Sequence, residues 1–169
     1  MSGSKAADFE EFAHARSSQL LRTACLLTGD WHLAEDLVQE TFGKLFPRWN
    51  RVSTMDSPMA YAHTTLVRTF LSARRLKRWS EHPAEELPEP HAPVGEDIEL
   101  RLALLEGLAR LSPADRAVLV LRYWEDYSVK ETADILRTAP GTVPVRAKRA
   151  LGRLRALLGT ELRAPAATC

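Results

Sequence analysis

The chain has little of what marks many enzymes and secreted proteins. It carries 2 cysteines, Cys25 and Cys169, which lie far apart in the sequence and form neither a disulfide framework nor a metal-ligand cluster. Its 5 histidines show no ligand spacing, and no phosphate-binding glycine loop or nucleophile motif is present. The sequence therefore predicts no metal, no cofactor and no catalytic residues, and an enzyme is a distant alternative.

Long hydrophobic runs are also absent. No stretch is long enough to span a membrane, and the N-terminus lacks the basic-then-apolar pattern of a signal peptide. We therefore expect a soluble, cytoplasmic protein. Regular alternation of apolar and polar residues, the pattern of a half-buried strand, does not occur either. The fold class that this predicts is all-α.

The charge is balanced in total but segregated along the chain. Its 23 basic and 22 acidic residues give a net charge of +1. Every charged residue from 61 to 79 is basic, and every one from 81 to 99 is acidic. Prolines among the acids suggest a linker, which we place at 80–97. We expect two small helical domains, 8–79 and 98–160, with disordered termini at 1–7 and 161–169.

Capping signals predict where the helices begin. Asp30 is expected to cap a helix over about 31–49, after a first helix over about 8–27. Ser57-Pro58 and Ser112-Pro113 each combine an N-cap with proline at the first helical position. They predict helices over about 58–78 and 113–124, and leucines in register predict another over 98–111.

Residues 128–158 have the pattern of a helix-turn-helix. Ser128 and Glu131 form a capping box, small Ala133 would allow a second helix to cross closely, and Pro140-Gly141 marks the turn. The following helix has an apolar stripe at helical spacing. On its other faces every charged residue before Glu161 is basic. A basic amphipathic helix after a short capped helix is the arrangement that binds DNA, although an ordinary solvated helical hairpin is the plainer alternative.

Two stretches resemble bacterial sigma factors. The run LSPADRAVLVLRYWEDYSVKETADILRTAPGTVPVRAKRALGRLR, residues 111–155, is similar to their fourth conserved region. The run AEDLVQETFGKLFPRW, residues 34–49, is similar to their second region. In the order of the two runs and in its short length, the chain resembles the extracytoplasmic-function group (group IV) of the sigma-70 family. The resemblance implies a promoter-specificity subunit that binds bacterial core RNA polymerase and promoter DNA.

The resemblance also implies roles for particular residues. An exposed face of the second helix, with acidic and amide side chains, would bind the clamp coiled coil of core polymerase. Its residues are Glu35, Asp36, Gln39 and Glu40. Binding to the −10 element falls to the basic helix and its end, Arg68, Arg74, Arg75, Lys77, Arg78 and Trp79. Binding to the −35 element falls to the last helix, Thr142, Arg146, Lys148, Arg149 and Arg153. The resemblance implies the polymerase flap as a further partner. It also implies a possible anti-sigma factor, although no residue identifies one.

The chain departs from the family at the tip of its last helix. Where the family has Gly-Thr-Val-Lys-Ser, this sequence has Gly-Thr-Val-Pro-Val, residues 141–145. A proline inside a helix costs about 3 kcal/mol, but little among the first helical residues. We therefore predict a late helix start, with Thr142 as N-cap. Arg68 likewise replaces a common asparagine, so base preferences at both promoter elements are expected to differ from those of relatives.

A second function remains open from the residues alone. A stand-alone helix-turn-helix regulator would use its N-terminal half as a sensor or dimerisation module. Such a protein would form a stable dimer and bind an operator without polymerase. The basic third helix and the acid-x-x-Gln-Glu pattern of the second helix favour the sigma factor instead.

Overall fold

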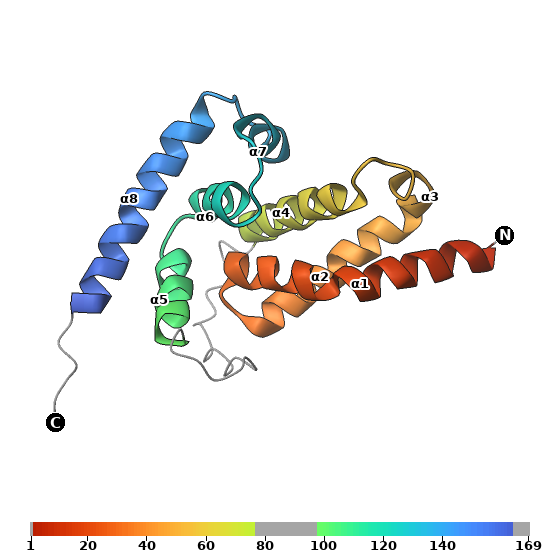
Figure 1. Cartoon of the computed structure of the whole chain (residues 1–169), viewed down its shortest axis with the longest axis horizontal. Coiled ribbons are helices and arrows are strands. Elements are labelled where there is room, and N and C mark those ends of the chain that lie inside the picture. The colour runs from red at the N-terminus through yellow and green to blue at the C-terminus, as the bar shows by residue number, and fades with distance from the viewer. Residues whose placement is uncertain (1, 77–97, 164–169) are drawn as a thin grey trace. The chain divides into compact units, whose positions relative to one another are not determined.

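The computed structural model describes residues 2–76 and 98–163, which form two compact helical units (Figure 1). No strand occurs within these residues, so the predicted all-α class is confirmed. The predicted acidic linker at 80–97 lies outside the described residues. Among the described helices, none combines the length and the hydropathy needed to cross a membrane.

The first unit is built from three long helices. Helix α1 (Ser2–Thr28), α2 (Trp31–Leu45) and α4 (Pro58–Leu76) pack against one another. A 3-10 turn, η1 (Phe46–Arg48), and the short α3 (Trp49–Val52) connect α2 to the loop before α4. The core contains buried side chains from every one of these helices, including Leu20, Leu27, Leu37, Val38, Leu45, Trp49, Val52, Leu66, Val67 and Phe70.

The helix starts predicted from capping residues are confirmed in this unit. Gly29 adopts the left-handed conformation, with φ of 69°, and ends α1. The next residue, Asp30, accepts a hydrogen bond from the backbone N–H of Leu33 at 3.0 Å and caps α2. The hydroxyl of Ser57 accepts from the N–H of Ala60 at 3.1 Å, which fixes the start of α4. These local bonds fix where α2 and α4 begin, and α2 carries the exposed acidic residues predicted above.

The start of α1 differs from the prediction. We expected residues 1–7 to be disordered, but α1 begins at Ser2. Aromatic packing anchors this end, because Phe9 makes edge contacts with Phe46 and Trp49 at centroid distances of 5.1 and 5.3 Å. The ammonium group of Lys5 also lies 5.1 Å from the Phe46 ring centroid, within range of a cation–π contact. These contacts act across elements, so local sequence could not predict them.

The second unit surrounds one long helix. It consists of α5 (Ile98–Ala109), α6 (Pro113–Leu119), η2 (Val120–Trp124), α7 (Val129–Leu136) and α8 (Thr142–Arg163). Helix α8 packs against α5, α6 and α7. Val118, Ala133, Val143 and Ala147 form its buried cluster, so the predicted close crossing at Ala133 is confirmed.

Helix α5 also approaches α8 closely, at Gly107. Gly107 is buried in α5, and a Cβ built there would lie 2.8 Å from Cδ1 of Leu154. A hydrogen at this position therefore allows the two helices to pack at short range. The composition of α5 gave no signal, because glycine within a helix does not reveal what faces it.

The end of α6 is a π-helix. Ser112 caps α6, as predicted, by accepting from the N–H of Asp115. The chain then widens into η2, where the N–H of Glu125 donates to the carbonyl of Val120 at 2.9 Å. Tyr123, in η2, is 60 % exposed. The wider turn rotates the residues that follow it relative to a regular helix.

The helix-turn-helix begins with the predicted capping box. The N–H of Ser128 donates to the Glu131 carboxylate at 2.8 Å, and the N–H of Glu131 donates to the Ser128 hydroxyl at 3.1 Å. Helix α7 ends at Arg137, which adopts the left-handed conformation with φ of 53°. The N–H of Thr138 then donates to the carbonyl of Ala133 at 3.0 Å and closes the turn.

Helix α8 starts late, as predicted. Thr142 is the first helical residue, so α8 begins one residue earlier than it would with Thr142 as the N-cap. Pro144 is then the third helical residue, where the backbone N–H has no partner within the helix and its absence costs nothing. At the other end α8 continues through Arg163, so the predicted disordered tail is wrong for residues 161–163. Residues 164–169 lie outside the described residues.

Candidate nucleic-acid and polymerase interfaces

Helix α8 separates a buried face from a basic outer face. Val143, Ala147, Ala150 and Leu154 are at most 7 % exposed and point into the second unit. On the opposite side Val145, Lys148, Arg149 and Gly152 are exposed. The spacing of these four residues, i, i+3, i+4 and i+7, places them on one side of a helix. We call them the outer face of α8.

The cations of the outer face have no acidic partner. Among the described residues, no ion pair or hydrogen bond involves the side chains of Lys148, Arg149 or Arg155. Unpaired cations gathered on one helix form a site for phosphates or base edges. Thr142, the remaining predicted −35 residue of the first turn, is half-buried at the start of the helix.

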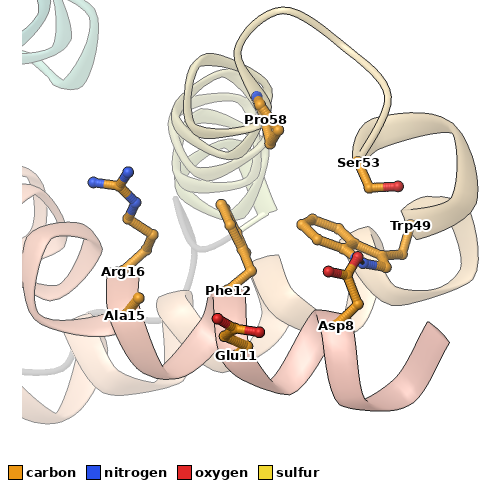
Figure 2. Close-up of a pocket in the computed structure, with 8 residues that line it drawn as sticks. All are labelled: Asp8, Glu11, Phe12, Ala15, Arg16, Trp49, Ser53 and Pro58. Atoms are coloured by element: carbon orange, nitrogen blue, oxygen red, sulfur yellow. Dashed lines mark hydrogen bonds between the residues drawn. The ribbon is translucent and has the colours of Figure 1, made fainter. Parts of the chain in front are cut away.

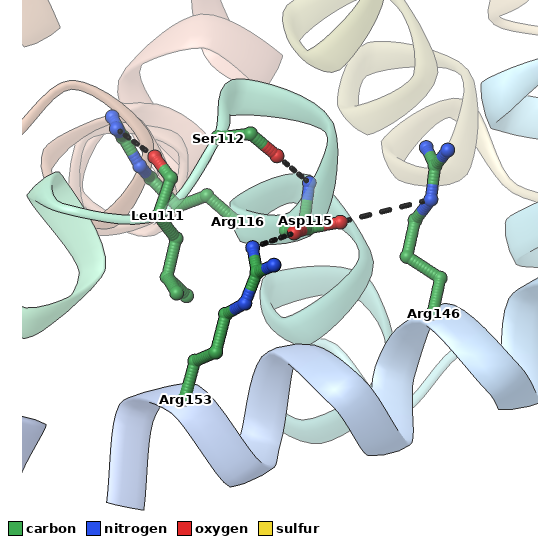
Figure 3. A network of polar contacts seen from close by, with 6 residues as sticks. All are labelled: Leu111, Ser112, Asp115, Arg116, Arg146 and Arg153. Atoms are coloured by element: carbon green, nitrogen blue, oxygen red, sulfur yellow. Dashed lines mark hydrogen bonds and ion pairs between the residues drawn. The ribbon is translucent and has the colours of Figure 1, made fainter. Parts of the chain in front are cut away.

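Two other predicted arginines are held by a carboxylate from α6 (Figure 3). Nε of Arg146 lies 3.7 Å from Oδ1 of Asp115, and Nη1 of Arg153 lies 3.6 Å from Oδ2. Asp115 is placed by its own backbone, whose N–H donates to the Ser112 hydroxyl at 3.2 Å. Asp115 comes from another helix, so the charges along α8 alone could not reveal it.

The Asp115 contact leaves part of each arginine available. Arg146 is contacted through Nε alone, so its two terminal nitrogens are directed away from the carboxylate in Figure 3. The side chains of Arg146 and Arg153 remain 40 % and 60 % exposed, whereas that of Asp115 is 13 % exposed. Asp115 therefore restrains both arginines on one flank of α8 without burying them.

A buried arginine organises the loop before α6. Nη2 of Arg116 donates to the carbonyls of Ala109 and Leu111 at 3.1 and 3.0 Å, and the residue is 3 % exposed. Its bonds fix the loop between α5 and α6, and so fix where α6 begins. Arg116 is therefore a structural cation that holds Asp115 in position relative to α8.

The exposed side of α2 carries the residues predicted to bind polymerase. Glu35, Asp36, Gln39 and Glu40 are all exposed, while Ala34, Leu37, Val38 and Thr41 are buried. Glu35 accepts a hydrogen bond from the indole N–H of Trp31 at 2.7 Å, and Glu40 lies 3.3 Å from Nζ of Lys44. Among the described residues, Asp36 and Gln39 make no hydrogen bond or ion pair through their side chains. These four residues form what we call the acidic face of α2.

The basic run after residue 61 is described only in part. Arg68 is half-buried on α4. Arg74 and Arg75 belong to the helix, but their side chains lie outside the description, as do Lys77, Arg78 and Trp79 altogether. Phe70 is 3 % exposed and belongs to the core. Of the predicted −10 residues, the structure therefore places the side chain of Arg68 alone.

A surface pocket of about 360 Å³ lies between α1, α3 and the start of α4 (Figure 2). Phe12 and Trp49 form its apolar wall, with ring centroids 4.7 Å apart. The carboxylates of Asp8 and Glu11 lie along its edge, and Asp8 accepts from the indole N–H of Trp49 at 2.8 Å. Negative charge here disfavours phosphates. Its residues come from separate helices, so no single stretch of the sequence indicates this pocket.

Titratable groups near the helix-turn-helix are shifted by their surroundings. Burial raises the pKa of Tyr127 to about 12, and the charges of Glu125 and Glu131 add to the increase. The N–H of Ser128 lowers the pKa of the Glu131 carboxyl by donating to it, and the Ser128 side chain adds to the effect. At neutral pH, Glu131 is thus charged and completes the cap of α7.

Comparisons with known proteins bear on both units. Residues 12–80 match the model of sigma-70 region 2, and residues 101–154 match that of sigma-70 region 4. The RNA polymerase sigma-E factor of Streptomyces coelicolor is 36 % identical over 149 residues, covering 88 % of this chain and 84 % of that protein. The sigma factor SigM of Mycobacterium tuberculosis, of the extracytoplasmic-function type, is 29 % identical and covers 89 % and 77 %.

Solved structures give the same result for the fold. The sigma factor RpoE of Bartonella quintana, in complex with the anti-sigma factor NepR, matches with a TM-score of 0.74 at 25 % identity. The alignment covers 90 % of this chain and 97 % of that one. The extracytoplasmic-function sigma factor SigJ of Mycobacterium tuberculosis matches with a TM-score of 0.61 at 26 % identity, covering 92 % and 57 %.

Proposed function

The chain belongs to the sigma-70 family of RNA polymerase sigma factors, in the extracytoplasmic-function group, and we propose which of its surfaces bind polymerase and the two promoter elements. As a sigma factor it binds core RNA polymerase and directs transcription initiation at promoters. No comparison supports the stand-alone regulator. We propose further that it catalyses no reaction itself and acts in the cytoplasm, where polymerase and chromosome meet.

The acidic face of α2 is the proposed core-polymerase site. Asp36 and Gln39 project from a helix whose other side is buried in the first unit, and within the described residues neither is occupied. Carboxylates and an amide on a rigid helix suit pairing with arginines of a partner, which steers association and fixes register. Glu40 is shared with Lys44, so we assign it a smaller part than Asp36.

The outer face of α8 is the proposed −35 site. The observation that carries this proposal is the pair of unpartnered cations, Lys148 and Arg149, on the outer face of the second helix of a helix-turn-helix. Such a helix enters the major groove, and the residues near its N-terminus contact base edges. Arg149 is assigned to base edges and Lys148 to phosphates. Arg146 and Arg153, held by Asp115, are assigned to the flanking strand.

The basic end of the first unit is the proposed −10 site. Arg68, Arg74, Arg75, Lys77 and Arg78 supply the cations that single-strand capture needs, and Trp79 supplies a stacking surface. The two units then contact one promoter, and polymerase sets the distance between them. A second contact from a tethered unit gains effective concentration only where that distance fits.

An anti-sigma factor is a further proposed partner. The sigma factor of Bartonella quintana that this chain resembles was solved in complex with one, NepR. We propose that such a partner would cover a surface that polymerase needs. The acidic face of α2 is the surface we assign to such competition.

The core-binding proposal is tested with a charge reversal. The variant Asp36→Arg with Gln39→Ala should bind purified bacterial core polymerase at least tenfold more weakly than the unchanged chain, in a competition assay against a labelled sigma factor. The matched control is Glu10→Arg, which makes the same charge change at an exposed residue of α1. Equal binding by the α2 variant and the control would contradict the assignment of this face.

A further inference from the structure

Val145 stands out on the outer face of α8. It is 57 % exposed, although it lies in the first turn of the helix, the part that meets base edges in a helix-turn-helix. The buried stripe is on the other side, with Val143 at 0 % and Ala147 at 4 % exposure. Val145 therefore lies outside the buried stripe that packs the second unit together.

A single exposed valine is common on protein surfaces and needs no explanation by itself. What distinguishes Val145 is its surroundings. Lys148 and Arg149, at i+3 and i+4, flank it on the next turn with unpaired charges. At i+7 lies Gly152, where an added Cβ would meet no atom within 4 Å. The middle of the outer face is thus smooth and apolar, with cations on both sides.

The ion pairs with Asp115 support this arrangement. They hold Arg146 and Arg153 on the flank of α8 that faces α6, away from the middle of the outer face. Because Asp115 holds these two arginines to one side, their long side chains do not have to move to expose Val145. A helix with this profile would place its cations near the phosphates and Val145 near the floor of the groove.

Only one apolar group is available to Val145 in the major groove. Thymine presents its C5-methyl there, whereas cytosine, adenine and guanine present hydrogen-bonding atoms. A valine side chain has no donor or acceptor with which to contact those atoms. We propose that Val145 contacts the C5-methyl of one thymine in the −35 element, so that this chain selects T·A at that position. The inference rests on the proposed −35 role of α8.

The test removes the methyl group from the DNA rather than from the protein. A promoter is first selected from a random library by the holoenzyme, and each thymine of its −35 element is then replaced, singly, by deoxyuridine. At one position we expect holoenzyme binding to weaken about three- to fivefold, the factor that corresponds to losing the burial of one methyl group. Replacement of the other thymines should change binding less than twofold.

Protein variants then assign the effect to Val145. Val145→Ala should weaken binding to the thymine promoter and abolish the difference between thymine and deoxyuridine. The control variant Lys148→Ala should weaken binding to both DNAs equally and should keep that difference. If the unchanged holoenzyme shows no deoxyuridine effect at any position, or if Val145→Ala retains it, the inference is wrong.

Failure of the proposed function gives a different result. If the holoenzyme binds scrambled and selected −35 elements equally, while the −10 element still matters, then α8 does not read this element at all. That outcome overturns the −35 assignment, and the inference with it. A −35 preference without methyl sensitivity overturns the Val145 contact alone. Placing cytosine and then 5-methylcytosine at the contacted position gives a second readout, since the methyl group gained there should restore part of the binding that cytosine loses.

Discussion

Replacing Asp115 by asparagine removes one charge that holds two arginines. The ion pairs measure 3.7 Å to Arg146 and 3.6 Å to Arg153, whose side chains are 40 % and 60 % exposed. Solvent screening limits each such pair to about 0.2–1 kcal/mol. A carboxylate in the first turn of α6 adds about 0.3–1 kcal/mol through the helix dipole. We therefore expect Asp115→Asn to lower the free energy of unfolding of the second unit by about 1–2 kcal/mol.

Hydrogen exchange in the full chain measures this change within the second unit. Amides of α6 and α8 should exchange faster in the variant, while amides of α1 and α2 should not change. Asp126→Asn is a suitable control, because Asp126 is exposed with φ of 57°, a conformation that asparagine adopts equally well. The same charge is removed there without breaking an ion pair. Equal effects of the two variants would mean that the contacts of Asp115 contribute nothing specific.

The same substitution should also change DNA binding. Arg146 and Arg153 would no longer be restrained and could contact additional phosphates. Binding to duplex without a promoter should tighten, and its dependence on salt should steepen by up to about 0.9 per added phosphate contact in a plot of log K against log salt. Discrimination between the −35 element and a scrambled duplex should fall. Unchanged affinity, salt slope and discrimination would refute the idea that Asp115 restrains these arginines.

Three further predictions concern α7 and its cap. Thr132 is 0 % exposed, and its hydroxyl has no hydrogen-bond partner among the described residues. Thr132→Val should therefore raise the free energy of unfolding, measured by urea titration, by about 1 kcal/mol. A lower free energy of unfolding would mean that the hydroxyl does have a hydrogen-bond partner. Ser128→Ala should lower the free energy of unfolding by about 1 kcal/mol, and Ser128→Asp, which restores an N-cap, should recover most of that loss. An unchanged free energy of unfolding in Ser128→Ala would show that the capping box is dispensable. Because the pKa of Tyr127 is raised to about 12, the folded state holds this proton more tightly, so its stabilising effect is complete below pH 10 and is lost between pH 10 and about 12. Tyrosinate absorbance should show this late titration, and Tyr127→Phe should remove it; a tyrosine titration confined to pH 10 would contradict the burial.

Features set by neighbouring residues were predictable from the sequence. The caps at Asp30, Ser57, Ser112 and Ser128 form as expected, because each bond joins residues three apart. The late start of α8 followed from the chemistry of Pro144 in the same way. Local signals of this kind predicted the helices, and apolar stripes predicted the buried faces of α2 and α8.

Features that depend on helices meeting were not predictable. The pairing of Asp115 with Arg146 and Arg153 requires the start of α6 to lie beside α8. The close approach at Gly107 requires the crossing of α5 and α8. The predicted disorder of residues 2–7 was wrong for the same reason, since Phe9 and Lys5 anchor this segment on Phe46. No single-helix pattern contains these contacts.

These contacts also change the interpretation of the basic helix. Counted along the sequence, its cations formed one uniform surface. In the structure, Asp115 restrains Arg146 and Arg153 on one flank of α8. Lys148 and Arg149 are unpaired among the described residues and lie on the outer face, one turn after Val145. We therefore propose that base contacts are concentrated in the first two turns of α8 and that phosphate contacts surround them.

The most direct test of the account is run-off transcription with purified bacterial core polymerase on a promoter library, with and without this chain. We predict transcripts that depend on the chain, start at defined positions and share both a −10 and a −35 element. The variant carrying Lys148→Ala and Arg149→Ala should lose preference for the −35 element and keep the −10 element. Core polymerase that gives the same transcripts with and without the chain would contradict the central claim.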